Sequence, residues 1–177
     1  MITIEPINAD QQQQVIRRVG ELLQHCAQRL DHDFKPIECR FDLRGRSSGM
    51  YVIKNRQRYL RFNPFIFAKY FEDSLATTVP HEVAHYVADI LFGFRHIRPH
   101  GEEWRDIMRL LGAEPRVTGN YDLTGLPVRQ QRRFDYRCAC MTHSLTTVRH
   151  NRIRRGQSEY VCRKCGEHLR RESTSLA

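Results

Sequence analysis

The sequence lacks several features that mark whole classes of protein. No segment of its 177 residues approaches the roughly 18 consecutive apolar residues of a membrane-spanning helix. Residues 1–20 do not show the charged-then-apolar order of a secretory signal, and Arg17 and Arg18 follow a polar run, Gln11–Gln14. There is no solenoid-type repeat and no low-complexity segment. With a mean hydropathy of −0.61, we expect a soluble, cytoplasmic protein.

Acidic residues are scarce in the last part of the chain. Residues 129–177 contain 12 Lys and Arg against 4 Asp and Glu, so they carry +8 of the net charge of +9. A basic segment on a nearly neutral body favours a polyanionic partner such as nucleic acid, although a solvated basic tail would have the same composition. We therefore predict two domains, residues 1–127 and residues 128–177.

Few cysteines lie in the body of the chain. Cys26 and Cys39 stand alone there, and we expect both to be ordinary buried side chains. The other four are Cys138, Cys140, Cys162 and Cys165. Without a secretory signal, clustered cysteines are metal ligands more often than disulfides, because a reducing compartment keeps thiols free.

The hydrophobic pattern predicts a mixed α and β body. Apolar residues recur at helical spacing between residues 10 and 30, whereas residues 37–44 alternate as in a half-buried strand. Two further strands, residues 50–53 and 59–62, flank a turn at Lys54-Asn55-Arg56. We expect these three strands to form a small antiparallel meander without parallel βαβ units.

Helical spacing then returns from Asn63-Pro64 to Phe92. Pro80 lies inside this stretch, so we expect a kink there or a new helix with Thr77 or Thr78 as N-cap. Another helix is predicted over residues 102–111, and residues 119–133 resemble a linker.

The segment His81-Glu82-Val83-Ala84-His85 carries the first chemical motif. On a helix, residues 81 and 85 leave the same face about 6 Å apart along the axis, so both imidazoles can hold one ion. Glu82 is offset by one residue, where its carboxylate can take a proton from the attacking water and return it to a leaving amine. This HExxH pattern is typical of zinc hydrolases, and Glu82 is the predicted catalytic base.

A zinc site of this kind needs a third protein ligand. Leu91 excludes the metzincin spacing, which would place histidine there. We choose His100 because it opens the next predicted helix, from which a side chain can face back across a short loop. His96 remains the second choice. The full set of candidates is His96, His100, Glu102 and Glu103.

Together, VPHEVAH, a short Gly-containing loop, HGEEW and LLG closely resemble the SprT family, bacterial relatives of the Spartan metalloprotease domain. The resemblance covers most of the chain. It implies an α+β zincin-like domain followed by a zinc ribbon, with zinc on His81, His85 and His100 and Glu82 as base. It also implies that Trp104 packs the third-ligand helix against the core, and that the substrates are proteins attached to DNA.

The second motif is the cysteine cluster. Cys138-x-Cys140 and Cys162-x-x-Cys165 are separated by 21 residues with two β-prone stretches, residues 144–148 and 159–161. A hairpin joined around Gly156 would bring the two pairs together into a closed four-sulfur zinc site. His143 forms a Cys-x-x-His alternative with Cys140, so a mixed ligand set stays open.

Basic side chains surround the predicted ribbon, and two tyrosines lie among them. Arginine can grip phosphate and tyrosine can stack on an unpaired base, so the pattern supports nucleic-acid binding. His150 and His168 are expected to be surface residues. The residues concerned are Arg149, Arg152, Arg154, Arg155, Arg163, Lys164, Arg170, Arg171, Tyr136 and Tyr160.

The function predicted from these motifs is a zinc metallopeptidase, with one catalytic and one structural Zn²⁺, that a basic ribbon holds on DNA or nucleoprotein. The alternative is a zinc-containing, nucleic-acid-binding regulatory protein without significant peptidase activity; hydrolysis of a non-peptide amide is a third. Candidates for stabilising the oxyanion are Tyr121, Arg98 and His96.

Overall fold

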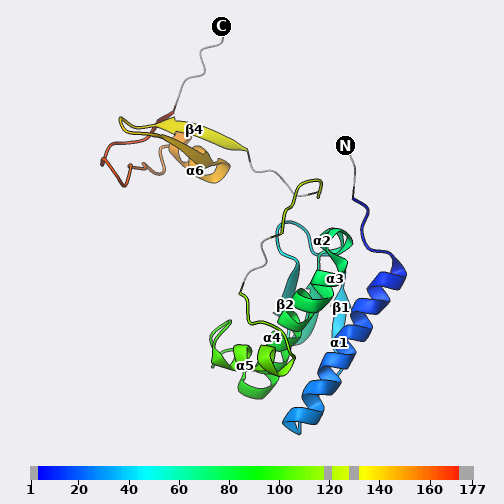
Figure 1. Ribbon diagram of the computed structural model, residues 1–177. Helices are drawn as coiled ribbons and strands as arrows, with labels where there is room; N and C mark the ends of the chain where they lie inside the picture. The colour runs from blue at the N-terminus through cyan, green and yellow to red at the C-terminus, as the bar shows by residue number, and fades with distance from the viewer. Residues whose placement is uncertain (1–3, 118–120, 128–131, 172–177) are drawn as a thin grey trace. The chain divides into compact units, whose positions relative to one another are not determined.

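The computed structural model describes residues 4–117, 121–127 and 132–171, and it divides into two compact units, Met1–Val128 and Arg129–Ala177 (Figure 1). Each unit combines helices with a small sheet, which agrees with the predicted α+β class. Within the described residues, no helix has both the length and the apolar character needed to cross a bilayer.

The first unit begins with helix α1, Ala9–Leu30. Asn8 caps it, because its side chain accepts a hydrogen bond from the Gln11 N–H while the Gln11 side chain accepts one from the Asn8 N–H. The predicted helix is therefore confirmed, together with its apolar stripe, whose members Val15, Val19, Leu22, Leu23 and Cys26 are buried.

A three-stranded sheet follows, in the order β1-β3-β2. Its strands are β1, Glu38–Arg40, β2, Gly49–Lys54, and β3, Gln57–Phe62. β2 and β3 form the predicted hairpin, with Asn55 and Arg56 at positive φ in the two-residue turn. The predicted antiparallel meander was wrong for β1. This strand is shorter than predicted and pairs with β3 in parallel. The reason is that the chain continues through residues 41–48 and enters β2 on the far side of β3.

The HExxH motif lies on helix α4, Val79–Phe92. Three short helical segments precede it, namely α2, Pro64–Lys69, α3, Phe71–Asp73, and the π-helical turn η1, Ser74–Thr78. Pro80 has no N–H and its ring would clash with the carbonyl four residues earlier, which accounts for the widened turn before it. A new α-helix does begin at Val79 with Thr78 in the N-cap position, as predicted, although Thr78 has helical φ and ψ and its side chain makes no capping hydrogen bond.

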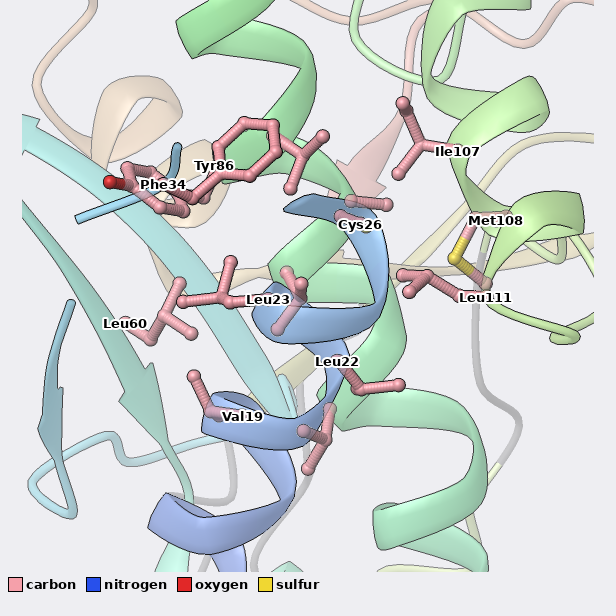
Figure 2. Close-up of a cluster of buried hydrophobic side chains, with 14 of the residues drawn as sticks. Val19, Leu22, Leu23, Cys26, Phe34, Leu60, Tyr86, Ile107, Met108 and Leu111 are labelled. Atoms are coloured by element: carbon pink, nitrogen blue, oxygen red, sulfur yellow. The ribbon is translucent and has the colours of Figure 1, made fainter. Parts of the chain in front are cut away.

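Helix α5, Glu102–Leu110, completes the layer of helices. Figure 2 shows α1 side chains, including Leu22, Leu23 and Cys26, directed into a core with residues from α4, α5 and β3. Tyr86 of α4 and Met108 of α5 are buried in this core. Burial of α1 and α5 against α4 fixes the helix that carries His81, Glu82 and His85.

The predicted linker is partly ordered against the first unit. The Lys69 ammonium donates to the carboxylate and carbonyl oxygens of Asp122 and to the Thr124 carbonyl at 2.8–2.9 Å. The Tyr70 hydroxyl also donates to the Asp122 carbonyl at 2.9 Å. Residues 121–124 are therefore anchored, while residues 119–120 and 128–131 of the predicted linker lie outside the described part of the chain.

The second unit is a three-stranded antiparallel sheet in the order β5-β4-β6 with one helix. Its elements are β4, Arg133–Arg137, β5, Thr142–Thr146, α6, Thr147–Arg154, and β6, Arg170–Arg171. The hairpin predicted around Gly156 was wrong. β4 and β5 pair instead around the first cysteine pair, and Thr147 and Val148 begin a helix.

Candidate metal centres

Helix α4 directs His81 and His85 toward the same point. The two residues are one turn apart, and their Nε2 atoms lie 3.3 Å from each other. Neither side chain is fully buried, so the imidazole nitrogens border a cavity while the backbone stays within the core helix.

His100 reaches the same point from the loop before α5. Its Nε2 lies 3.1 Å from that of His81 and 3.1 Å from that of His85. The residue has φ of 60°, in the left-handed region, and the Gly101 N–H donates to the Arg98 carbonyl in the same turn. The turn thus positions His100, while His96 lies beside Gly93 and outside the group formed by the three histidines.

The separations between the three nitrogens fit a single metal ion. Ligands at roughly 2.0–2.1 Å from a tetrahedral zinc would lie about 3.3 Å apart, close to the observed 3.1–3.3 Å. Burial lowers the pKa of His81 to about 4 and that of His85 to about 3, and neighbouring histidine charge adds to the effect. These imidazoles are neutral at pH 7, which is the form that binds a metal.

Trp104 forms the support beneath the three histidines. Its indole N–H donates to the His81 carbonyl at 3.2 Å, and its ring centroid lies 4.7 Å from those of His81 and His100. Contacts of this kind orient ligating imidazoles in metal sites. The Arg116 backbone acts on the His81 ring in the direction of a higher pKa, against the effect of burial. Trp104 is 1% exposed and therefore also anchors α5 to the core.

Glu82 is buried on the side of α4 that faces β2. Among the residues that the structure describes, Glu82 and Asp89 are the buried acidic side chains. Burial raises the pKa of Glu82 to about 8, and a hydrogen bond with the Tyr51 backbone partly offsets this rise. A carboxylate without surrounding water is a stronger base than one at the surface. Glu82 therefore has the environment that a general base requires.

A cavity of about 300 Å³ joins Glu82 to the three histidines. Its rim is apolar and partly exposed at Met50, Phe94 and Val117. Of the three oxyanion candidates, Arg98 lines this cavity. Tyr121 does not. Its hydroxyl donates to the Asp73 carboxylate at 2.7 Å.

Sequence reasoning missed two contributors to this site. Gly49 and Tyr51 come from the edge strand β2, and both line the cavity. The Tyr51 hydroxyl and the Arg58 guanidinium each donate to Asp89 Oδ2 at 2.6 Å, and the Phe94 N–H donates to Asp89 Oδ1 at 2.7 Å. The signal available in the sequence was Asp89, a second acidic residue besides Glu82 on this mostly apolar helix. It joins β2, β3 and the loop that leads to His100.

The second unit gathers the four clustered cysteines. All four Sγ atoms lie within 4.8 Å of one another, and the separations are 3.5 Å for Cys138 to Cys140 and 3.6 Å for Cys140 to Cys162. Sulfurs at about 2.3 Å from a tetrahedral zinc would lie about 3.8 Å apart, so the four thiols fit one zinc ion.

His143 lies beside the cysteine cluster. Its Nε2 is 3.3 Å from Cys138 Sγ, but it is outside the group in which every donor lies within 4.8 Å of every other. Burial raises the pKa of Cys138, and hydrogen bonds with His143 and the Cys140 backbone lower it to about 6 overall. The geometry favours His143 as a donor to the thiolate rather than a replacement for a cysteine.

Two expectations about the basic unit were wrong. Tyr136 is 1% exposed and its hydroxyl lies 3.0 Å from His150 Nδ1, so it cannot stack on a base. His150 is also buried, with its ring stacked on Phe134 at 3.7 Å between centroids. His168 is exposed, as expected. The tyrosine that remains partly accessible is Tyr160, over which the Arg149 guanidinium lies at 5.5 Å.

Comparison with known proteins gives a consistent match. Residues 19–132 match the SprT-like family. The protein is similar to Protein SprT of Shewanella oneidensis, with 36% identity over 159 residues, which cover 89% of this chain and 97% of that protein. Protein SprT of Yersinia enterocolitica is 35% identical over 159 residues, 89% of each chain, and that of Escherichia coli is 35% identical over 89% and 92%. No solved structure matches significantly.

Proposed function

This chain belongs to the SprT-like family, and from that membership we propose that it is a cytoplasmic zinc-dependent peptidase of the SprT type. In this proposal the first unit is a zincin-like catalytic domain and the second is a zinc ribbon. The observation that carries the proposal is the convergence of three histidine Nε2 atoms within 3.3 Å in a cavity that also contains the buried Glu82 carboxylate.

The ligands in this proposal are His81, His85 and His100 for the catalytic zinc and the four clustered cysteines for the structural one. A zinc ion bound by three neutral imidazoles would polarise a peptide carbonyl and acidify the attacking water. A closed sulfur site would hold together a unit that has few buried apolar residues.

The side chains of this protein would carry out the proton transfers. Glu82 would accept a proton from the attacking water and deliver it to the leaving amine, since its carboxylate lies in the cavity between β2 and α4. Trp104 would keep His81 in place through its hydrogen bond to the His81 carbonyl. Arg98 lines the cavity and supplies a positive charge that could stabilise the oxyanion.

The proposed substrates are proteins bound to or crosslinked to DNA, and the proposed partner of the second unit is nucleic acid. The support is the charge distribution, with +8 of the net +9 in residues 129–177. Such a unit would concentrate the enzyme on nucleoprotein through phosphate neutralisation.

The experiment that tests the proposal compares Glu82→Gln with the matched variant Glu102→Gln. Both remove one carboxylate, but Glu102 lies on the exposed side of α5 in an ion pair with Arg105. At equal zinc content, cleavage of a DNA-bound protein should fall by about 10²–10⁴ in Glu82→Gln and should persist in Glu102→Gln. Equal activity would remove Glu82 as base. No cleavage by the native protein on any DNA-bound substrate would favour the regulatory alternative.

A further inference from the structure

The sheet of the second unit has two unlike faces. On one face, α6 packs against β4 and β5 (Figure 1). The side chains of Tyr136, Leu145 and His150, which come from these three elements, are buried. Because side chains alternate along a strand, residues 133, 135 and 137 of β4 point to the opposite face. All three are exposed.

The residues on this exposed face form rows across the strands. Arg137 lies opposite Thr142 of β5 on one side and opposite Arg170 of β6 on the other. In the next rows, Asp135 lies opposite Ser144 and Arg133 lies opposite Thr146. This sheet face therefore consists of three arginines, one carboxylate and three hydroxyl groups: Arg133, Arg137, Arg170, Asp135, Thr142, Ser144 and Thr146.

Arg137 and Arg170 bring two guanidinium groups together on this face. The Cα atoms of residues opposite each other in an antiparallel pair lie only about 4.5–5.5 Å apart, so both side chains can reach the same ligand. Guanidinium groups placed in this way can bind phosphate oxygens through charge-assisted hydrogen bonds. A hollow of about 560 Å³ adjoins this pair, and its lining also includes Arg171, His168 and the Glu167 carboxylate.

The chemistry of the face also says which part of a nucleic acid it fits. It contains no aromatic side chain among the described residues, because Phe134 and Tyr136 point to the covered face. Arginine and hydroxyl side chains without an aromatic platform bind phosphate and sugar oxygens, whereas unpaired bases need a ring to stack on. We propose that the exposed face of the β5-β4-β6 sheet binds the sugar–phosphate backbone of nucleic acid, without preference for base sequence.

This inference rests on the proposed function, since it names the surface by which the second unit would hold nucleic acid. It differs from that proposal in one respect that can be tested separately. Basic residues also lie on and after α6, and a general attraction would use them equally. The sheet-face proposal predicts that the three arginines of the sheet matter and those of α6 do not.

The experiment uses the zinc-loaded full chain and two triple variants with the same change in charge. One is Arg133→Gln, Arg137→Gln, Arg170→Gln; the control is Arg152→Gln, Arg154→Gln, Arg155→Gln, which alters exposed residues of α6 and its C-cap. Fluorescence anisotropy would give the affinity for duplex and single-stranded oligonucleotides of two base compositions over a range of salt. Zinc content and circular dichroism would verify the fold of both variants.

For the sheet variant on duplex DNA, the magnitude of the slope of log affinity against log salt should decrease by about 2.7. This corresponds to about 0.9 for each of the three phosphates that the variant no longer neutralises. For the control variant, the magnitude of the slope should decrease by less than about one third of that amount. The affinities for the two base compositions should be equal. Equal decreases in the two variants would overturn the sheet-face proposal while leaving nucleic-acid binding intact. If the native protein bound no oligonucleotide, the proposed nucleic-acid partner would be overturned instead. This would hold whether or not the protein bound another polyanion, polyglutamate.

Discussion

Gly49 on β2 lies so close to Glu82 on α4 that a β-carbon at position 49 would be 2.6 Å from Glu82 Oε1. The same β-carbon would lie 2.7 Å from Glu82 Cγ and 2.7 Å from Thr78 Cγ2. Real β-carbons do not approach other atoms so closely, so any larger residue would displace the carboxylate or the strand. Gly49 thus sets how deeply Glu82 sits between β2 and α4.

We predict that Gly49→Ala lowers peptidase activity far more than it lowers zinc content. A displacement of about 1 Å in a catalytic group can reduce the rate about 10²-fold. The three atoms nearest to a β-carbon at position 49 belong to Glu82 and Thr78, not to the histidines. The measurements are kcat on a protein substrate and elemental zinc analysis.

Gly20→Ala is the control for that substitution. Gly20 lies within α1, and a methyl group there would have no neighbouring atom within 4 Å. Alanine at this position should therefore raise the free energy of unfolding by about 0.5–1 kcal/mol and leave activity unchanged. If Gly49→Ala were as active as Gly20→Ala, the close approach to Glu82 would have no catalytic importance.

We predict that Asp89→Asn destabilises the first unit by about 2 kcal/mol, because it removes the charge from a buried carboxylate that accepts charge-assisted hydrogen bonds, one of them from the partly exposed Arg58. The Asp89 side chain is 3% exposed. Burial raises the pKa of Asp89, but hydrogen bonds from Arg58 and Tyr51 lower it overall below its usual range. The exposed carboxylate Asp106, paired with Arg109, provides the control variant Asp106→Asn, which should cost less than about 1 kcal/mol.

The sign of the pH dependence follows from the lowered pKa of Asp89. Its contribution to stability is fully present above the pKa of the unfolded chain and is lost as the pH falls toward the folded value. Denaturant unfolding at pH 7 and at successively lower pH below 4 should therefore show the native protein and Asp89→Asn becoming more alike in acid. A difference that stayed constant over that range would contradict the ionic role of Asp89.

The parts of the site that follow from local spacing could be predicted from the sequence. His81 and His85 share a helix face because four residues make about one turn, and the resemblance to the SprT family is confirmed by the comparisons. The α+β class and α1 with its buried stripe were also predictable from hydrophobic periodicity.

Contacts between distant segments could not be predicted in this way. Gly49 precedes Glu82 by 33 residues, and nothing in the local pattern shows that its strand packs against α4. Helix α6 was missed because Thr147 and Val148 are β-branched and favour strand, yet tertiary packing of His150 against Phe134 and Tyr136 favours a helix there. The same packing buries Tyr136, which the charge pattern alone assigned to base stacking.

We predict that the protein binds two zinc ions independently. His81→Ala and Cys162→Ser should each lose about one zinc equivalent and keep the other, since the two ligand sets belong to different compact units. The sulfur site should release zinc more slowly to a chelator because its four positions are all filled by protein. Elemental analysis of the two variants measures this directly, and loss of both ions from either one would contradict independence.

The last prediction concerns Trp104, whose indole supports all three histidines. Trp104→Phe keeps an aromatic ring over His81 and His100 but removes the N–H that donates to the His81 carbonyl at 3.2 Å. Since that carbonyl belongs to the first turn of α4, removing the hydrogen bond should loosen His81 and weaken zinc binding about 10–100-fold, as other changes to groups behind metal ligands do. Competition with a chelator measures this affinity. Trp104→Leu, which also removes the ring, should weaken it further and lower the free energy of unfolding by several kcal/mol, because a fully buried indole leaves a cavity. Unchanged zinc affinity in Trp104→Phe would show that packing of the ring alone positions His81.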